Sequence, residues 1–461
     1  MIQSQSIIEQ ARNYLEQGNK LRSQGKIEQS VQKYCQSIEI KPDFIPSLIK
    51  LAEAYESQSD WESEIICLSR IIELKPDIPA MHLRLARALK KQGNYFSSFK
   101  AYEKAAELKQ DWTPEIYQEI GDAYKQNCKL GEAALFYQKA IYLSPSNHIF
   151  YLSLGDLYSS MSDFAVAAKV YQQVLKSNSG HRKKIYEKLA ASYIKLGQHD
   201  EARQASKFAA LLSEPRPLFS NKHNLTMLFS AKAGCTFAAK WFFYQAGLLD
   251  AAEAYHSWIH NFRVQVFYKS AEYRESIDSM LDSSTNTIKI VRNPYSRAVS
   301  SYIHAIKYGY ADTEMKAYLG REVTSERKFS FREFVGYLSS IDLWNCDIHH
   351  RIQVSLLERE AFLKVDYTVH LEESLTRLKS IEMELNLKDS NYSLLSKSSH
   401  HTSRAEFDDF SGDKIFCLRP SDKSEFIPHA KSFYDDELQA KISYLYAIDF
   451  LQYGYDKNVL P

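Results

Sequence analysis

Hydrophobic and polar positions repeat at a fixed spacing in the first half of the chain. Pro42 and Pro76, each in a Lys-Pro-Asp segment, are 34 residues apart, and similar turns follow at Gln110 and Pro145. Between the turns, aromatic and small residues recur at helical spacing; the strongest copy has Tyr117, Ile120, Gly121, Tyr124, Ala133, Tyr137, Ala140 and Pro145. Small residues let two helices approach while aromatic rings fill the space beside them. Each period therefore predicts two antiparallel helices.

This period and residue pattern resemble the tetratricopeptide repeat. In-register copies cover about residues 11 to 216, and the resemblance implies six helix pairs stacked into a curved solenoid. It also implies a groove for a peptide or partner protein, with a spacer or dimerisation arm as the alternative. Pro215 and Pro217 stand too close together for a helix to continue. We therefore predict a helical domain over 1–216 and a second domain over 217–461.

The pattern changes after residue 222, where short apolar runs alternate with longer helical stretches. Leu225–Phe229 and Thr287–Val291 are predicted strands, and the alternation favours an α/β domain built on a central parallel sheet. A polar segment directly follows each of these two strands. Ligands of open α/β sheets bind at the carboxyl ends of the strands, so both segments are candidates for binding.

The first polar segment is Ser230-Ala231-Lys232-Ala233-Gly234-Cys235-Thr236, and a helix is predicted directly after it. A strand, a turn and a helix N-terminus can together hold an anionic group. The candidate binding residues are Lys232, Ala233, Gly234, Cys235 and Thr236. Because Lys232 precedes the glycine, the segment lacks the GxxxxGK[ST] arrangement of nucleotide triphosphatases.

The second polar segment runs from Val291 to Tyr302 and contains Arg292, Pro294 and Ser300. Arg292 ends the strand and can offer a forked guanidinium group to a phosphate, whereas Pro294 is suited to the first position of a helix. Ser300 lies eight residues after Arg292, two turns along that helix. Arg292 and Ser300 are therefore candidates for binding a second phosphate.

Together the two segments resemble the donor-binding segments of the carbohydrate (Golgi-type, family 2) sulfotransferases. The resemblance implies a P-loop-like α/β domain that uses 3′-phosphoadenosine 5′-phosphosulfate as co-substrate. The first segment would bind its 5′-phosphosulfate, with Lys232 also acting in catalysis, and Arg292 and Ser300 would bind its 3′-phosphate. Two positions depart from the family pattern: Ala231 replaces a proline, and Asn293 stands where an acidic residue is usual.

Later stretches extend this resemblance to about residues 222–456. They are Phe331–Val335, Asp347–Gln353, Lys364–Glu372 and Phe433–Tyr455. Within the second stretch, His350 replaces a tryptophan of the family pattern and Ile352 replaces a proline.

Transfer of a sulfuryl group to a hydroxyl needs a base for the hydroxyl proton, and histidine has a suitable pKa. His260, between the two donor segments, resembles a histidine common in that region of the family, and His349 is the rival. Glu253 is the third candidate.

The motif subtype implies a carbohydrate or glycoconjugate acceptor. One alternative is a protein sulfotransferase whose repeats deliver a tyrosine or serine acceptor. The other is a scaffold that binds nucleotide without catalysis.

Charge and cysteine spacing limit the partners and the compartment. A formal net charge of +1 gives no overall attraction to nucleic acid or an anionic membrane. The six cysteines form no CxxC pair, so we expect neither a metal site nor a dense disulfide framework. We also expect no membrane span, although animal members of the family are typically anchored in the Golgi. These features, with the fused repeats, favour a bacterial cytoplasmic enzyme.

Overall fold

The computed structural model describes residues 2–175, 182–280, 285–395, 404–405, 409–418 and 427–461. The chain forms two compact units, Met1–Ser206 and Lys207–Pro461. None of the described helices is long and apolar enough to cross a membrane.

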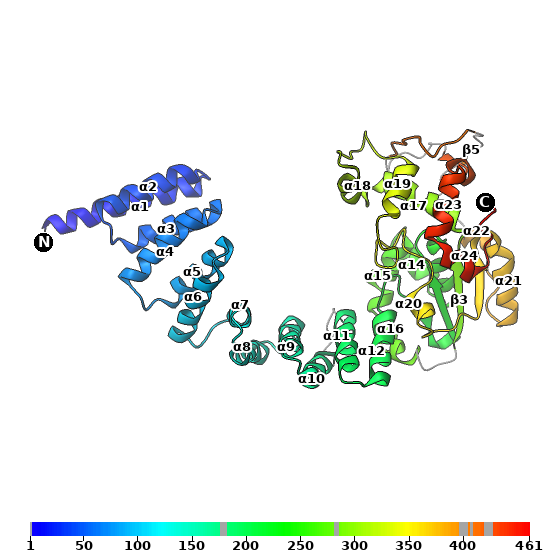
Figure 1. The fold of residues 1–461 in the computed structure, drawn as a ribbon, viewed down its shortest axis with the longest axis horizontal. Coiled ribbons are helices and arrows are strands. Elements are labelled where there is room, and N and C mark those ends of the chain that lie inside the picture. The colour runs from blue at the N-terminus through cyan, green and yellow to red at the C-terminus, as the bar shows by residue number, and fades with distance from the viewer. Residues whose placement is uncertain (1, 176–181, 281–284, 396–403, 406–408, 419–426) are drawn as a thin grey trace. The chain divides into compact units, whose positions relative to one another are not determined.

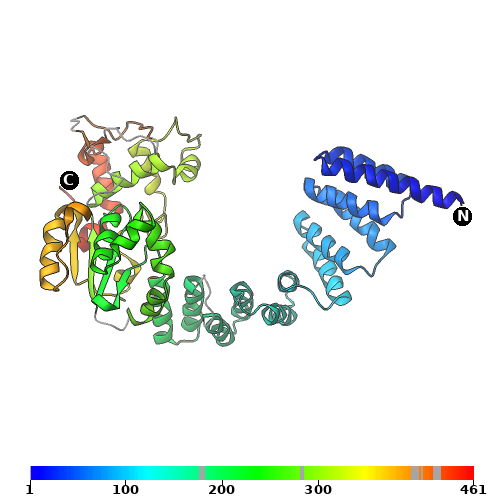
Figure 2. The same cartoon turned by 180° about the vertical axis from the view of Figure 1, so that it is seen from behind.

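The first unit is built from consecutive helix pairs (Figures 1 and 2). The described residues up to Leu211 form twelve helices, which confirms six pairs: α1 (Ile2–Ser23), α2 (Ile27–Ile40), α3 (Ile45–Gln58), α4 (Trp61–Leu74), α5 (Pro79–Gln92), α6 (Tyr95–Leu108), α7 (Pro114–Gln126), α8 (Leu130–Leu143), α9 (His148–Ser160), α10 (Phe164–Leu175), α11 (Arg182–Lys195) and α12 (His199–Leu211). The last two residues of α12, Ala210 and Leu211, pack in a hydrophobic cluster of the second unit.

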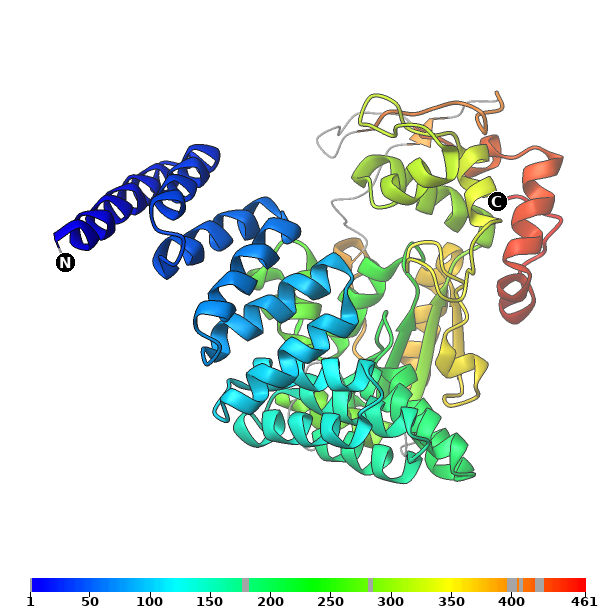
Figure 3. The same ribbon diagram turned by 60° about the vertical axis from the view of Figure 1, so that its left-hand side comes forward.

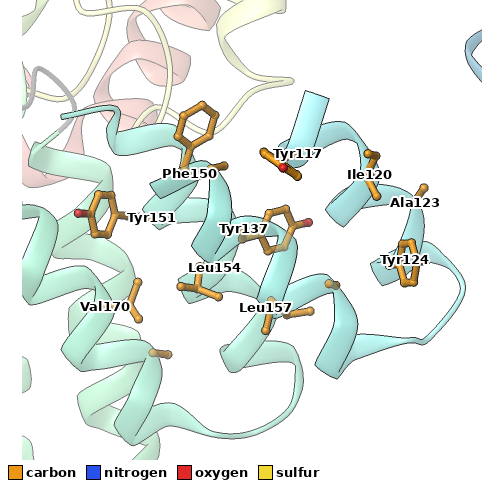
Figure 4. Packing of buried hydrophobic residues seen from close by; sticks show 14 of the residues in the cluster. Tyr117, Ile120, Ala123, Tyr124, Tyr137, Phe150, Tyr151, Leu154, Leu157 and Val170 are labelled. Carbon is orange, nitrogen blue, oxygen red and sulfur yellow. The ribbon is translucent and has the colours of Figure 1, made fainter. Parts of the chain in front are cut away.

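One contact between the two helices of a pair recurs in three repeats and explains the glycine and tyrosine positions of the pattern. It joins Gly18 to Tyr34, Gly121 to Tyr137 and Gly155 to Tyr171. A Cβ atom on these glycines would lie 2.4, 2.8 and 2.3 Å from the tyrosine ring, so a larger residue would require the ring to shift. The tyrosine hydroxyls donate hydrogen bonds to the side chains that follow the glycines, Asn19, Asp122 and Asp156. Figure 4 shows Tyr137 packed among Ile120, Leu154 and Leu157.

The second unit has a four-stranded sheet in the order β1-β2-β3-β4. These strands are β1 (Leu218–Ser220), β2 (Leu225–Phe229), β3 (Asn286–Val291) and β4 (Tyr367–His370), seen as green to orange arrows in Figure 3. The three strands β2, β3 and β4 are parallel, as predicted. The short edge strand β1 pairs antiparallel with β2, so the complete sheet is mixed.

Helices connect and cover these strands. Between β2 and β3 lie α13 (Cys235–Gln245), α14 (Leu249–Tyr255), α15 (Ile259–Gln265) and α16 (Ala271–Met280). Between β3 and β4 lie α17 (Pro294–Tyr308), α18 (Asp312–Leu319), α19 (Phe331–Leu338) and α20 (Leu356–Arg359). After β4 come α21 (Ser374–Glu384), α22 (Tyr392–Leu395), the short strands β5 (Arg404–Ala405) and β6 (Ile427–Pro428), α23 (Asp436–Leu445) and α24 (Ala447–Tyr453).

Two hydrophobic clusters hold this unit together. One joins β2, β3 and β4 to α13, α15 and α21, and the other joins α17 and α19 to α23 and α24. Because the sheet is buried by both sets of helices, the loops at the carboxyl ends of its strands have a fixed base.

Candidate active site

The parallel strands bring the two polar segments together. Phe229 at the end of β2 is paired with Ile290, and Val291 at the end of β3 is paired with His370. The loop 230–234, the junction 292–293 and the segment 371–372 therefore leave neighbouring strands at the same edge of the sheet.

The first loop ends in an open helix N-terminus. Lys232 and Gly234 both have left-handed backbones, with φ of 65° and 75°. Gly234 is the N-cap of α13, and no side chain of the described residues caps the first-turn N–H groups of this helix. A Cβ atom on Gly234 would lie 2.5 Å from Leu371 Cδ1, so only glycine fits there. Turns with left-handed residues at a helix N-terminus gather N–H groups that can surround an anion.

Lys232 provides a cation beside these N–H groups. Its side chain is partly buried, and its ammonium group has no hydrogen-bond or ion-pair partner among the described residues. Burial is the largest cause that lowers the pKa of Lys232 to about 8. The nearby Arg292 and Arg297 also lower this pKa, whereas Cys235 raises it. Three cationic groups thus lie near one another, which is an electrostatic environment that a multiply charged anion would stabilise.

Two arginines of the second segment bind the backbone of the first. Arg292 Nη1 donates to the carbonyl oxygen of Lys232 at 3.1 Å, and the buried Arg297 donates through Nε to that of Ala231 at 3.0 Å. These bonds hold two carbonyl groups of the loop against guanidinium groups. The loop that contains Ala231 is therefore held by two hydrogen bonds, one from Arg297 on α17 and one from Arg292, two residues before this helix.

The second segment begins its helix differently. The Asn293 side chain caps α17 by accepting from the N–H groups of Tyr295 and Ser296, which is why asparagine can replace an acidic residue here. Ser300 is partly buried on α17, and no side-chain hydrogen bond joins it to another described residue. Phosphate binding at this segment would therefore depend on side chains rather than on the helix N-terminus.

The comparisons with known proteins agree with this geometry. Residues 216–456, more than half of the chain, match the model of the sulfotransferase family. The chain belongs to the sulfotransferase family. Residues 79–111, 114–147 and 152–209 match models of the tetratricopeptide repeat. Both parts of the predicted fusion are thereby confirmed.

Solved structures similar to this sulfotransferase align with part of the chain. MamA from Desulfovibrio magneticus RS-1 is 18% identical over 36% of this chain and 94% of its own, with a TM-score of 0.32. PilF from Pseudomonas aeruginosa is 16% identical over 43% and 90%, with a TM-score of 0.32. YrrB is 14% identical over 40% and 92%, with a TM-score of 0.35. Among curated proteins, none matches this sulfotransferase significantly.

Gln353 connects the two donor segments of the sulfotransferase domain. Its side chain accepts from the backbone N–H of Arg292 at 3.0 Å and donates to the carbonyl oxygen of the same residue at 2.9 Å. Its own carbonyl oxygen accepts from Ser230 Oγ and from Lys289 Nζ. The buried carboxylate of Asp449 accepts from the Gln353 backbone N–H. Gln353 is therefore a positioning residue for both segments.

Sequence reasoning placed Gln353 in a family-like stretch without assigning it this role. The signal that could have revealed it is Lys289, a charged residue in the middle of the apolar strand β3. Lys289 and Glu358 are 1% and 3% exposed and form an ion pair of 2.8 Å. A buried lysine needs several oxygen partners, so this residue is a signal for polar groups beside the strand end.

The segment after β4 also contacts both donor segments. Leu371 lies against Gly234, and Glu372 accepts from the backbone N–H of Asn293 at 3.0 Å. Tyr455, near the end of the chain, donates to the other oxygen of Glu372 at 3.0 Å. Two of the late family-like stretches therefore contribute contacts to the site.

The structure places the three candidate bases differently. His260 is buried on α15, and its Nε2 lies 3.2 Å from Thr236 Oγ1 and 3.5 Å from Cys235 Sγ, at the first turn of α13. His349 contacts Asp347 through Nδ1 and stacks against His304 and Tyr310, outside the first loop. Glu253 forms an exposed ion pair with Lys240. Only His260 is brought against the loop by these contacts.

Proposed function

We propose that this sulfotransferase moves a sulfuryl group from 3′-phosphoadenosine 5′-phosphosulfate to a hydroxyl of a carbohydrate or glycoconjugate. The observation that carries the proposal is the uncapped N-terminus of α13 beside the unpaired Lys232, with Arg292 bound to the same loop. The residues present fit a donor with two anionic ends.

The proposed binding follows from the charges of the two segments. The N–H groups of Gly234, Cys235 and Thr236 and the Lys232 ammonium hold the 5′-phosphosulfate. Arg292 and Ser300 hold the 3′-phosphate. When no donor is bound, Lys232 has a depressed pKa, and a multiply charged anion beside it favours its protonated form.

The proposed reaction is a direct in-line transfer. The acceptor oxygen forms a bond to sulfur while the bond from sulfur to the bridging phosphate oxygen breaks, and adenosine 3′,5′-bisphosphate leaves with that electron pair. Lys232 stabilises the negative charge that grows on the bridging oxygen. His260 takes the proton from the acceptor hydroxyl. Its contact with Thr236 favours it over His349 as this base.

A transfer assay tests this proposal. The full chain is incubated with donor labelled in the sulfuryl group and a panel of oligosaccharides, and donor binding is measured in parallel with adenosine 3′,5′-bisphosphate. Labelled glycan supports the proposal. Nucleotide binding without transfer to any acceptor would favour a scaffold, and absence of both would refute donor use.

A protein acceptor is the second candidate, because the first unit has an aromatic hollow. This hollow of about 620 Å³ lies on α7 and α8 and includes Tyr117, Tyr124 and Phe136. Tyr142 and Leu135 at its edge are 85% and 60% exposed. Such a surface fits a peptide with apolar side chains, consistent with the protein binding that the repeats suggest.

Deletion of the repeats separates the two acceptors. The deletion should begin the chain at Lys207, because Phe208, Ala210 and Leu211 pack in the cluster of the sulfotransferase unit. Retained transfer to free oligosaccharide, with unchanged KM, would show that the repeats do not supply a carbohydrate acceptor. Loss of transfer to a tyrosine- or serine-containing peptide alone would assign the repeats to a protein acceptor.

We also propose a cytoplasmic location. All six cysteines are free thiols, as expected in a reducing compartment. Localisation of the tagged full chain by cell fractionation tests this proposal.

A further inference from the structure

A second cavity lies in the sulfotransferase unit. It has a volume of about 340 Å³ and lies between the start of α18, the end of α19 and the loop that follows α19. Its polar lining includes Tyr310, Glu314, Tyr337, Asp342, Asp347 and His350. We call it the acidic cavity, because the lining includes three carboxylates and neither lysine nor arginine.

His350 points to a ligand in this cavity. Its side chain is 1% exposed, and neither ring nitrogen has a hydrogen-bond partner among the described residues. The rings of Tyr310, Phe334 and Tyr337 surround it at centroid distances of 6.0 Å. Burial lowers the pKa of His350 to about 4, so the ring is neutral, with one donor and one acceptor nitrogen. Packing alone does not require these nitrogens, since phenylalanine has a similar shape.

The carboxylates give the cavity a negative potential. Hydrogen bonds from the Trp344 backbone and the Asn345 side chain lower the pKa of Asp342. Burial raises the pKa of Asp347, but the hydrogen bonds from His349 outweigh it and lower the value overall. Glu314 is exposed at the edge. A cation between these carboxylates and tyrosine rings would be stabilised.

The helix α17, which carries Ser300, makes hydrogen bonds both to the donor loop and to residues at the cavity. Arg297 donates to Ala231 of the donor loop and to the carbonyl oxygen of Arg351, the residue after His350. Ser301, the neighbour of Ser300, makes a hydrogen bond of 2.9 Å with the Tyr310 hydroxyl. A ligand in the cavity would therefore lie close to the donor site along α17.

We propose that the acidic cavity binds a sugar residue bearing a free, protonated amino group in the acceptor of the sulfotransferase. The ammonium group lies among the carboxylates, the sugar ring lies against the tyrosine rings, and His350 exchanges hydrogen bonds with a ring hydroxyl. This inference rests on the proposed function and specifies its substrate class as an amino sugar without N-acetyl or N-sulfo substitution.

The test measures the KM of the full chain for two acceptors. One is the tetrasaccharide of β-1,4-linked glucosamine and the other is its N-acetylated counterpart. We expect the KM for the free amine to be at least tenfold lower, because N-acetylation removes the charge. Equal KM values for the two tetrasaccharides would overturn the proposal.

Two variants locate the binding. His350→Phe should raise the KM for the glucosamine tetrasaccharide about tenfold or more, because the ligand loses both hydrogen bonds. The same variant should unfold at the same or a higher temperature than the wild type, which separates ligand binding from a structural role.

Glu314→Gln should raise the KM for the glucosamine tetrasaccharide about twofold to fivefold. Glu275→Gln, which changes an exposed carboxylate on α16, is the charge-matched control with no expected effect. An unchanged KM in both cavity variants would overturn the assignment.

Calorimetric binding of the glucosamine tetrasaccharide without donor separates this inference from the proposed function. Binding that His350→Phe abolishes would support the cavity even if no sulfuryl transfer were observed. Sulfuryl transfer to other glycans without binding of this tetrasaccharide would leave the proposed function standing and refute the amine site.

Discussion

The two strand-loop-helix segments of the sulfotransferase domain begin their helices in opposite ways. At α13 the N-cap is Gly234, and no side chain caps the first turn. At α17 the Asn293 side chain accepts from the backbone N–H groups of Tyr295 and Ser296. The first helix N-terminus is open to an external anion, whereas the second is closed by the protein itself.

The difference teaches how one fold element could serve the two ends of the proposed donor. The open segment offers backbone N–H groups and a cation where charge would grow during transfer. The closed segment offers only side chains, which suits an end of the donor that is held without reacting. The two segments also depend on each other, since Arg292 binds the Lys232 carbonyl and Gln353 binds both segments.

Replacement of Lys232 should have the largest effect. Lys232→Ala is expected to lower kcat by about 10²- to 10³-fold, since it removes a group that stabilises developing charge. Nucleotide affinity should fall much less, because the N–H groups and Arg292 remain. Transfer kinetics and calorimetry measure the two effects. Lys240→Ala on α13, the helix that follows the loop, removes a lysine paired with Glu253 and is the control. Equal losses of kcat in both variants would contradict the role of Lys232.

Gly234→Ala tests the open segment through its backbone. The new Cβ would meet Leu371 and occupy a left-handed position with φ of 75°. Left-handed strain alone costs about 1–2 kcal/mol, and the contact adds to it. We expect a loss of unfolding free energy and a loss of nucleotide affinity.

Gly320→Ala is the matched control for that variant. Gly320 has a φ of 62° and nothing within 4 Å of the added Cβ, so it reports the backbone strain without the contact. If both variants lose the same stability and both keep nucleotide affinity, the close approach of Leu371 to Gly234 has no role in the site.

The pH dependence of donor affinity should separate the two segments. The pKa of Lys232 is about 8 without donor, and a bound anion raises it. Affinity should therefore be constant below pH 8 and fall by up to about tenfold per pH unit as the pH rises above it. Lys232→Arg should remove this decline, because an arginine stays protonated. A decline that persists in Lys232→Arg would assign the titration to another group.

Gln353→Glu tests the connection between the segments. The variant keeps the side-chain oxygen that accepts from the Arg292 N–H. It loses the side-chain N–H that donates to the Arg292 carbonyl, and leaving this carbonyl buried without a hydrogen bond lowers the free energy of unfolding by about 1–3 kcal/mol. Nucleotide affinity should fall through displacement of Arg292. Chemical denaturation measures the first effect and calorimetry the second. Unchanged nucleotide affinity in a destabilised protein would limit Gln353 to a structural role.

The smallest effect is expected at the closed segment. Asn293→Ala should destabilise the fold by about 1 kcal/mol through loss of the helix cap, and Asn293→Asp should restore most of that stability. Neither should change kcat for sulfuryl transfer. A large loss of kcat in Asn293→Ala, measured at a temperature where the variant is folded, would show that this helix end also acts in transfer.

The repeats and the donor segments could be predicted because their signals are local. The 34-residue period specifies where the helices lie, and Gly121 and Tyr137 occupy positions that the helix contact requires. Adjacency of the two loops follows from their places after parallel strands. The roles of individual donor-site residues remain predictions, although the contacts bring Lys232, Arg292 and His260 to one loop or its flanking helix.

Other features depend on contacts between distant residues and had no local signal. Gln353 lies more than 60 residues from Arg292 in sequence, and its role exists only after both have folded. The antiparallel edge strand β1 has three residues, too few for a clear alternation of polar and apolar positions. The acidic cavity likewise combines α18, α19 and a loop, so its composition could not be recognised from one segment.

The tyrosines that join the repeat helices have a further consequence for the proposed transfer to hydroxyl groups. Tyr34, Tyr137 and Tyr171 are at most 1% exposed, and burial raises the pKa of each phenol. Each phenol also donates its proton to a fixed side chain within the helix pair. Their oxygens are neither accessible nor readily deprotonated, so the residues that hold the array together are protected from self-sulfation.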